Sequence, residues 1–155
     1  MDQYTMEVEE REPQPVLMSS FRCDVAELSE KLSQMLQAVY QLARQRGAEV
    51  CGPPFVRHST LNESTRDFQA GIPIRQPVEG SGSVVCDSLP GGMVAVTIHR
   101  GPHLELEKAR RTLNSWVRDN DFRLVGGPCE VYLSDPMLEP DMSQWETQLL
   151  QAVTK

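Results

Sequence analysis

A helical stripe of apolar residues is the strongest pattern in the chain and covers residues 24–47. Asp24 suits the N-cap position, with Glu27 three residues later as its capping-box partner. Gly47 follows two arginines at the place where a left-handed C-cap is common. The apolar positions between these signals recur at helical spacing and predict one amphipathic helix: Val25, Leu28, Leu32, Met35, Leu36, Val39, Leu42 and Ala43.

A second helical stripe follows Gly101-Pro102, a pair that opens the next helix. Its apolar positions are Leu106, Ala109, Leu113, Trp116 and Val117, and we expect Trp116 to lie in the core. The remaining side of this helix alternates acidic residues with three basic ones. We interpret it as an ordinary solvated face, and not as a nucleic-acid-binding patch, although it holds Lys108, Arg110 and Arg111.

Short β-type runs separated by turn signals make up most of the remaining chain. The first run, residues 5–23, contains Pro13 and Pro15, which favour an edge or bent strand over a central one. The next strands are expected within residues 51–58, 67–74 and 84–89. The last are expected within residues 93–99, 129–133 and 145–153, and residues 93–99 are the most strand-like run of all.

Three landmarks in the first half of the chain recur in the same order in the second half. Residues 16–22 match 94–100, Gly52-Pro53 matches Gly127-Pro128, and residues 68–74 match 147–153. The repeat predicts an α+β fold in which two β-α-β-β units, each with an antiparallel sheet and one helix, are related by a pseudo-twofold axis. We expect one domain over residues 1–155, with repeat one at about 5–89 and repeat two at about 90–155.

The faces of the two sheets that their helices do not cover should form a central ligand cleft. Period-2 alternation assigns side chains to faces. The residues assigned to the helix side are Val94, Val96, Ile98, Val131, Leu133, Thr147, Leu149 and Val153. The residues assigned to the cleft side are Ala95, Thr97, His99, Glu130, Tyr132, Glu146, Gln148 and Leu150, with Phe55, Arg57 and Gln69 at the matching places of repeat one.

Charge and composition exclude several classes of protein. The 155 residues carry a formal charge of −7, so direct nucleic-acid binding is not expected. No apolar run reaches the length of a membrane span, and the acidic N-terminus resembles no signal peptide, which predicts a cytoplasmic protein. The four cysteines lack metal-site spacing and read as reduced, mostly buried thiols, although one pair could form in an oxidising compartment. We expect no metal and no cofactor.

Several of these motifs resemble the GyrI-like small-molecule-binding family, the effector-binding domain of AraC-type and MerR-type bacterial multidrug regulators. The matching segments are residues 52–57 (GPPFVR), 70–74 (AGIPI), 89–92 (LPGG), 99–102 (HRGP), 127–136 (GPCEVYLSDP) and 145–153 (WETQLLQAV). The resemblance covers nearly the whole chain and implies two tandem β-α-β-β units around a central pocket. It also implies a ligand that is lipophilic and often cationic, held by aromatic walls and buried carboxylates.

The resemblance places Glu130 at one of the family's acidic positions. It also shows three departures: Gln148 stands at the second acidic position, His103 at a usual tyrosine and Leu150 at a frequent aromatic. The pocket is therefore expected to be less acidic and less aromatic than is typical. The candidate ligand-binding residues are Glu130, Tyr132, Gln148, Leu150, His99, His103, Phe55, Arg57, Gln69, Phe21 and Trp145.

Each candidate also has a purely structural interpretation. Glu130 could be an exposed strand carboxylate, Tyr132 a core ring, and Trp145 a clamp for its loop. His99 and His103 suit a polar pocket lining better than a metal site, because no third ligand has suitable spacing.

Three functions remain open. The favoured one is binding of a small lipophilic molecule, cationic ones included, by a sensor that acts through an unidentified protein partner or by a sequestering protein. The second is a hydrolase of cyclopropane-type lipophilic toxins, in which Glu130 and Tyr132 would be catalytic. The third is a protein-interaction role such as gyrase inhibition. The chain carries no known catalytic motif, which favours binding over catalysis.

Overall fold

The computed structural model describes residues 4–60, 65–89, 91–102, 105–134 and 140–155 and shows an α+β protein. The chain divides into two compact units. Residues 12–91 form one, here called the middle unit. The N-terminal segment and residues 92–155 form the other, here called the terminal unit. The cleft expected between two repeats stays a prediction.

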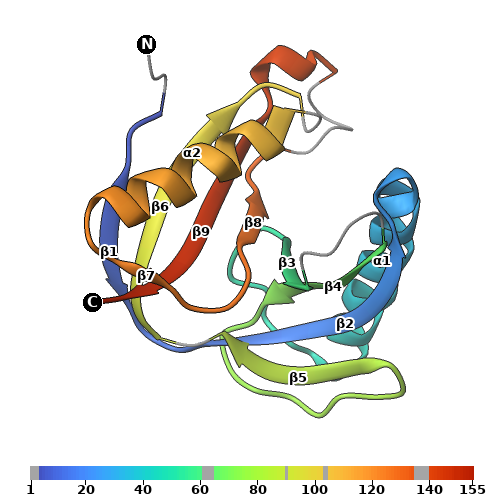
Figure 1. Ribbon diagram of the computed structural model, residues 1–155. Helices are drawn as coiled ribbons and strands as arrows, with labels where there is room; N and C mark the ends of the chain where they lie inside the picture. Colours follow the sequence, from blue (N-terminus) through green and yellow to red (C-terminus); the bar gives the residue numbers. More distant parts are fainter. Residues whose placement is uncertain (1–3, 61–64, 90, 103–104, 135–139) are drawn as a thin grey trace. The chain divides into compact units, whose positions relative to one another are not determined.

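The middle unit is an antiparallel sheet with one α-helix (Figure 1). Its strands lie in the order β3-β4-β2-β5. In chain order its elements are β2 (Gln14–Asp24), the 3-10 turn η1 (Val25–Glu27), α1 (Leu28–Arg46), β3 (Phe55–Thr60), β4 (Thr65–Pro73) and β5 (Val84–Leu89).

The end of helix α1 agrees with its sequence signal, but its start does not. Gly47 adopts a left-handed φ of 65° and caps the C-terminus, as expected. The predicted N-cap, Asp24, is instead the last residue of β2. A 3-10 turn intervenes, so the α-helix begins at Leu28 and the N-cap position falls on Glu27, whose side chain makes no capping hydrogen bond.

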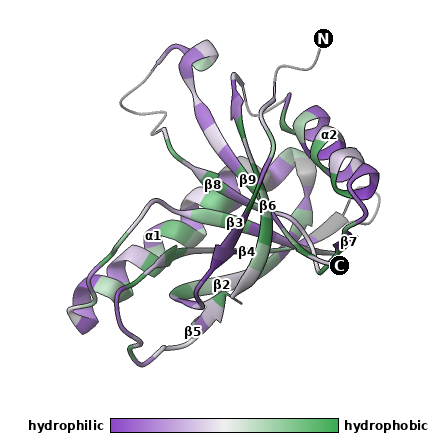
Figure 2. Ribbon diagram, turned by 90° about the vertical axis from the view of Figure 1, so that its left-hand side faces the viewer, coloured by the Kyte–Doolittle hydropathy of each residue, from purple (hydrophilic) through white to green (hydrophobic). Residues whose placement is uncertain are grey.

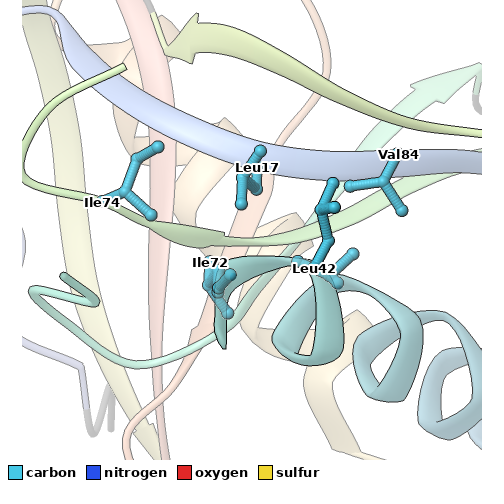
Figure 3. Close-up of a cluster of buried hydrophobic side chains, with 7 residues drawn as sticks. Leu17, Leu42, Ile72, Ile74 and Val84 are labelled. Carbon is cyan, nitrogen blue, oxygen red and sulfur yellow. The ribbon is translucent and has the colours of Figure 1, made fainter. Parts of the chain in front are cut away.

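The core of the middle unit lies between α1 and one face of β2 and β4. Figure 3 shows the side chains of Leu17, Ile72 and Ile74 on the sheet facing Leu42 of the helix. All four residues are at least nine-tenths buried. The C-terminal half of the apolar stripe of α1 (Val39, Leu42 and Ala43) thus packs on alternate positions of the strands, as the periodicities predict. Leu32, Met35 and Leu36, in the first half of the stripe, are only half-buried.

The expectation of a single proline-interrupted edge strand over residues 5–23 is wrong. The structure has two strands there, β1 (Glu7–Arg11) and β2, with Pro13 in the gap between them. β2 is an internal strand between β4 and β5. Pro15 is tolerated because it is the second residue of β2 and lies before the first residue paired with β4, which is Val16.

The terminal unit has strand order β1-β6-β9-β8, with β7 paired to β9, and all pairs are antiparallel (Figure 1). Its β1 comes from the N-terminus and pairs with β6. Its other elements are β6 (Gly92–Arg100), α2 (Leu106–Asp119), β7 (Arg123–Leu124), β8 (Cys129–Tyr132), the 3-10 turn η3 (Met142–Gln144) and β9 (Glu146–Thr154).

Helix α2 buries the predicted stripe. Leu106, Ala109, Leu113 and Val117 are at least nine-tenths buried against Leu149 and Val153 of β9, while Trp116 is half-buried at the margin. Figure 2 shows hydrophilic and hydrophobic residues alternating along α2, as expected for a helix with one buried face.

Two sequence expectations about the whole chain can be compared with the described residues. Of the four cysteines, which were predicted to be mostly buried, Cys23 and Cys129 are buried, Cys86 is half-buried and Cys51 is exposed. Within the part of the chain that the structure describes, neither helix is long and apolar enough to cross a bilayer.

Candidate functional site

Glu130 is the most deeply buried carboxylate on the sheet of the terminal unit. The residue is 2% exposed and sits in the second position of the short strand β8. Two donors from the same unit reach its carboxylate: the guanidinium of Arg110 on α2 donates to Oε2, and the Tyr132 hydroxyl donates to Oε1 over 3.3 Å. The Arg110 side chain is 17% exposed, so this is a largely buried ion pair.

Strand register places these groups on the sheet face that α2 covers. Glu130 lies directly opposite Leu149, and Tyr132 lies directly opposite Thr147. Directly opposed residues share a face, and Leu149 belongs to the core cluster under α2. Glu130 and Tyr132 therefore point toward the helix, which explains how Arg110 can reach the carboxylate.

Tyr132 is held as a neutral phenol. Burial raises its pKa well above the usual range, and the negative charge of Glu130 and the hydrogen bond to it raise it further. The hydroxyl therefore remains a donor to Glu130 at neutral pH. With Arg110 in place, the three side chains together carry no net charge.

Two more polar side chains lie on the same face of the terminal unit. Thr147, which is fully buried, is paired with His99 on one side and Tyr132 on the other. Its hydroxyl has no hydrogen-bond partner among the described residues. His99 is 2% exposed; its Nδ1 lies 3.0 Å from the Tyr4 hydroxyl and its Nε2 lies 3.3 Å from the carbonyl oxygen of Pro102.

These positions correct two face assignments. In β6 the sequence predicts Val94 and Val96 on the helix side, but Ala95 belongs to the cluster under α2. His99 shares the face of Ala95 and so lies on the helix side. The alternation misleads because the buried helix side of β6 carries the polar Thr97 and His99. The opposite side carries Val94, Val96 and Ile98, which was predicted to face the helix and is instead 40% exposed.

The second correction concerns β8. Val131, predicted to face the helix, points away from it, whereas Glu130 and Tyr132 face it. A charged residue reaches the buried face here because α2 supplies its partner. In β9 the assignment is correct: Leu149 and Val153 face α2. The residues on the opposite side are Glu146, Gln148 and Leu150.

The candidates from the middle unit divide between two faces of its sheet. Arg57 and Gln69 lie on the face away from α1, as expected, and Arg57 donates from Nε to Gln69 Oε1 over 2.6 Å. Phe55, 2% exposed, is on that same face. Phe21 lies on the α1 face instead, stacked on Phe68 with 5.5 Å between ring centroids.

The remaining candidates are placed apart from Glu130. Gln148 and Leu150 are half-buried on the far face of β9, so Gln148 does not stand beside Glu130. Trp145 is half-buried after η3, and its carbonyl accepts a hydrogen bond from the Gly101 backbone N–H over 2.8 Å. His103 lies outside the described residues.

Sequence reasoning missed Arg110, which it assigned to a solvated face. The signal was available in the spacing: Arg110 follows Leu106 by one helical turn and precedes Leu113 by three residues, so it shares their side of α2. Its neighbour Arg111 is exposed and lines a separate surface depression of about 400 Å³ with Trp116 and Lys108. Buried His58, which contacts Phe68 edge-on at 5.0 Å, was also missed.

Comparison with known proteins gives a family and several structural neighbours. A family model described as a GyrI-like small molecule binding domain matches residues 4–150. No curated protein matches the chain.

The C-terminal domain of EcmrR is similar with a TM-score of 0.88 and 20% identity, over 99% of each chain. EcmrR in a complex with DNA is similar with a TM-score of 0.86 and 21% identity, over 98% of this chain and 58% of the EcmrR chain. The present chain therefore spans less than two thirds of the length of EcmrR.

Two further neighbours are named for a ligand or an activity. SAV2435, solved bound to tetraphenylphosphonium, is similar with a TM-score of 0.63 and 8% identity, over 97% of this chain and 94% of that one. A hydrolase from Listeria innocua is similar with a TM-score of 0.70 and 16% identity, over 96% of this chain and 91% of that one. At these identities the likeness establishes the shared fold.

Proposed function

This chain belongs to the GyrI-like small-molecule-binding family, and we propose that it binds a small lipophilic molecule, organic cations included, beside Glu130 in the terminal unit. Binding, and not turnover, is the proposed activity. In EcmrR the similar domain is part of a longer chain that was solved in a complex with DNA. That arrangement supports a role as a ligand sensor over one in sequestration.

The observation that carries the proposal is the burial of the Glu130 carboxylate on the sheet face under α2, next to the apolar core cluster. Its direct neighbour Leu149 is fully buried in the core cluster under α2. A buried ion pair is often no more stabilising than well-packed apolar side chains of the same volume, because both charges lose their hydration. Stability alone therefore gives little reason to keep this carboxylate, whereas ligand binding does.

The surroundings of Glu130 suit a lipophilic ligand with a polar or charged centre. Leu113 of α2 and Leu149 of β9, both buried in the core cluster, make the packing on this face of the sheet partly apolar. The buried Thr147 hydroxyl offers an additional hydrogen-bonding group on the same face. Where Arg110 does not neutralise it, a desolvated carboxylate attracts a lipophilic cation strongly, because little water is present to screen it. SAV2435, of the same fold, was solved with tetraphenylphosphonium, a cation of this class.

The same contacts disfavour hydrolysis. Arg110 and Tyr132 donate to the two carboxylate oxygens of Glu130, so both oxygens already accept hydrogen bonds where a general base would accept a proton from water. The raised pKa of Tyr132 keeps that residue protonated, so it is also a poor base at neutral pH. Neither group is poised to activate water, and a cyclopropane-bearing alkylator incubated with the protein should be recovered intact by mass spectrometry.

The test is calorimetric titration of the protein with tetraphenylphosphonium, with Glu130→Gln as the site variant and Glu146→Gln as the matched control. Glu146→Gln also removes one negative charge, but from the opposite face of β9, where Glu146 forms an ion pair with Arg100. We expect Glu130→Gln to weaken binding at least tenfold and Glu146→Gln to leave it nearly unchanged. Equal effects of the two substitutions, or no binding by the unaltered protein, would contradict the proposal.

A further inference from the structure

The Glu130 site already contains a cation that belongs to the protein. The Arg110 guanidinium sits on the carboxylate that an incoming organic cation would need. We propose that Arg110 is a displaceable internal counter-ion: it leaves Glu130 when a cationic ligand binds, and it thereby sets the charge selectivity of the site. This inference rests on the proposed function and names the residue that determines which ligands the site accepts.

The two partners of the ion pair differ in their freedom to move. Glu130 is anchored in β8, which is hydrogen-bonded to β9, and it is 2% exposed. Arg110 projects from α2 on a long side chain with several rotatable bonds, and this side chain is 17% exposed. An arginine keeps its charge in water, so its departure requires no proton transfer. Arg110 is therefore the partner that can leave.

The same helix carries an alternative ion-pair partner for the released guanidinium. Glu107 is exposed and lies three residues before Arg110, a spacing that places the two side chains next to each other on a helix surface. The released charge can thus be solvated and partly paired outside the site. In this proposal Arg110 moves between Glu130 and Glu107 by a change of side-chain conformation alone, and the backbone of α2 keeps its position.

The charge balance of the site follows directly. With Arg110 seated, the site carries no net charge and discriminates little between lipophilic cations and anions. With Arg110 displaced or removed, the Glu130 carboxylate keeps its hydrogen bond from Tyr132 but loses the guanidinium as counter-charge. The buried negative charge then favours cations and repels anions. The unaltered protein must therefore bind organic cations more weakly than a variant that lacks the guanidinium, because each binding event competes with Arg110.

The experiment compares two ions of nearly identical shape and opposite charge, tetraphenylphosphonium and tetraphenylborate. Calorimetric affinities are measured at pH 8 for the unaltered protein, Arg110→Gln, Arg110→Lys and the control Arg111→Gln, which removes one exposed charge from the next position of α2. We expect Arg110→Gln to bind tetraphenylphosphonium at least tenfold more tightly and tetraphenylborate more weakly. Arg110→Lys should lie between, and Arg111→Gln should match the unaltered protein.

A second measurement needs no substitution in the ion pair. The side-chain Nε–H signal of Arg110 is followed by NMR while tetraphenylphosphonium is added. Movement of this signal to the position typical of exposed arginines supports displacement; an unchanged signal at saturation overturns it. Cation binding that depends on Glu130 but is equal in the unaltered protein and in Arg110→Gln overturns the inference and leaves the proposed function standing. Binding of neither ion to any variant overturns both.

Discussion

Gly71 in β4 lies where two strands approach so closely that no side chain fits. A Cβ at this position would lie 2.2 Å from the Leu17 carbonyl oxygen, 2.7 Å from Met18 Cβ and 2.9 Å from Met18 Cα. Two of these three atoms are backbone atoms of β2, so rotation of a side chain cannot relieve the clash. The substitution Gly71→Ala would force β2 and β4 apart.

The cost follows from what holds β2 in place. β2 is paired on both sides, with β4 and with β5, so any shift disturbs two hydrogen-bond ladders. Overpacking of a well-filled interior costs about 1–3 kcal/mol, and each weakened ladder hydrogen bond adds roughly 0.5–1.5 kcal/mol. We therefore expect Gly71→Ala to lower the free energy of unfolding by about 3–5 kcal/mol. For a chain of this size the melting temperature should fall by roughly 6–20 °C.

Gly47→Ala is the matched control. A Cβ there meets nothing within 4 Å, so the only penalty is the left-handed φ of 65°, which costs about 1–2 kcal/mol. Both variants are compared with the unaltered protein by urea unfolding and thermal melting. The reasoning is refuted if Gly71→Ala proves no more costly than Gly47→Ala, or if it unfolds within about 1 kcal/mol of the unaltered protein.

Two further predictions concern the terminal unit. The pKa of Tyr132 is raised in the folded protein, so the protonated phenol stabilises the fold. This stabilisation is complete below the unfolded-state pKa of about 10 and is lost as the pH rises beyond it. Above that pH the urea midpoint of Tyr132→Phe should therefore fall less steeply with pH than that of the unaltered protein, and equal slopes would contradict the argument. Leu113 in α2 is 1% exposed, so Leu113→Ala should lower the free energy of unfolding by about 2–5 kcal/mol. Leu124→Ala, at a residue 37% exposed, should cost about 1 kcal/mol or less; similar urea-unfolding losses for the two leucines would contradict the burial argument.

The sequence was sufficient for features that depend on local chain chemistry. Helical stripes located both helices, and Gly47 located the end of α1, because these signals act within one or two turns. Turn residues bounded β5 at residues 84–89 as predicted. The last strand was assigned to the correct faces, and its burial alternates residue by residue although its polar and apolar residues do not. Glu130 was identified as a candidate from its position in the motif that resembles the family.

Only the tertiary structure decided which way Glu130 points. The landmark match that aligned Gly52-Pro53 with Gly127-Pro128 pairs Glu130 with Phe55, yet Glu130 faces its helix and Phe55 faces away from its own. A shift of one residue in a strand exchanges its two faces. The sequence did not identify Arg110 as the partner of Glu130 for the same reason. An arginine on a helix is expected to be solvated unless a strand with a carboxylate is known to pack beneath it. Periodicity establishes that two faces exist, but the face that is buried depends on long-range pairing and packing, which residues distant in the chain supply.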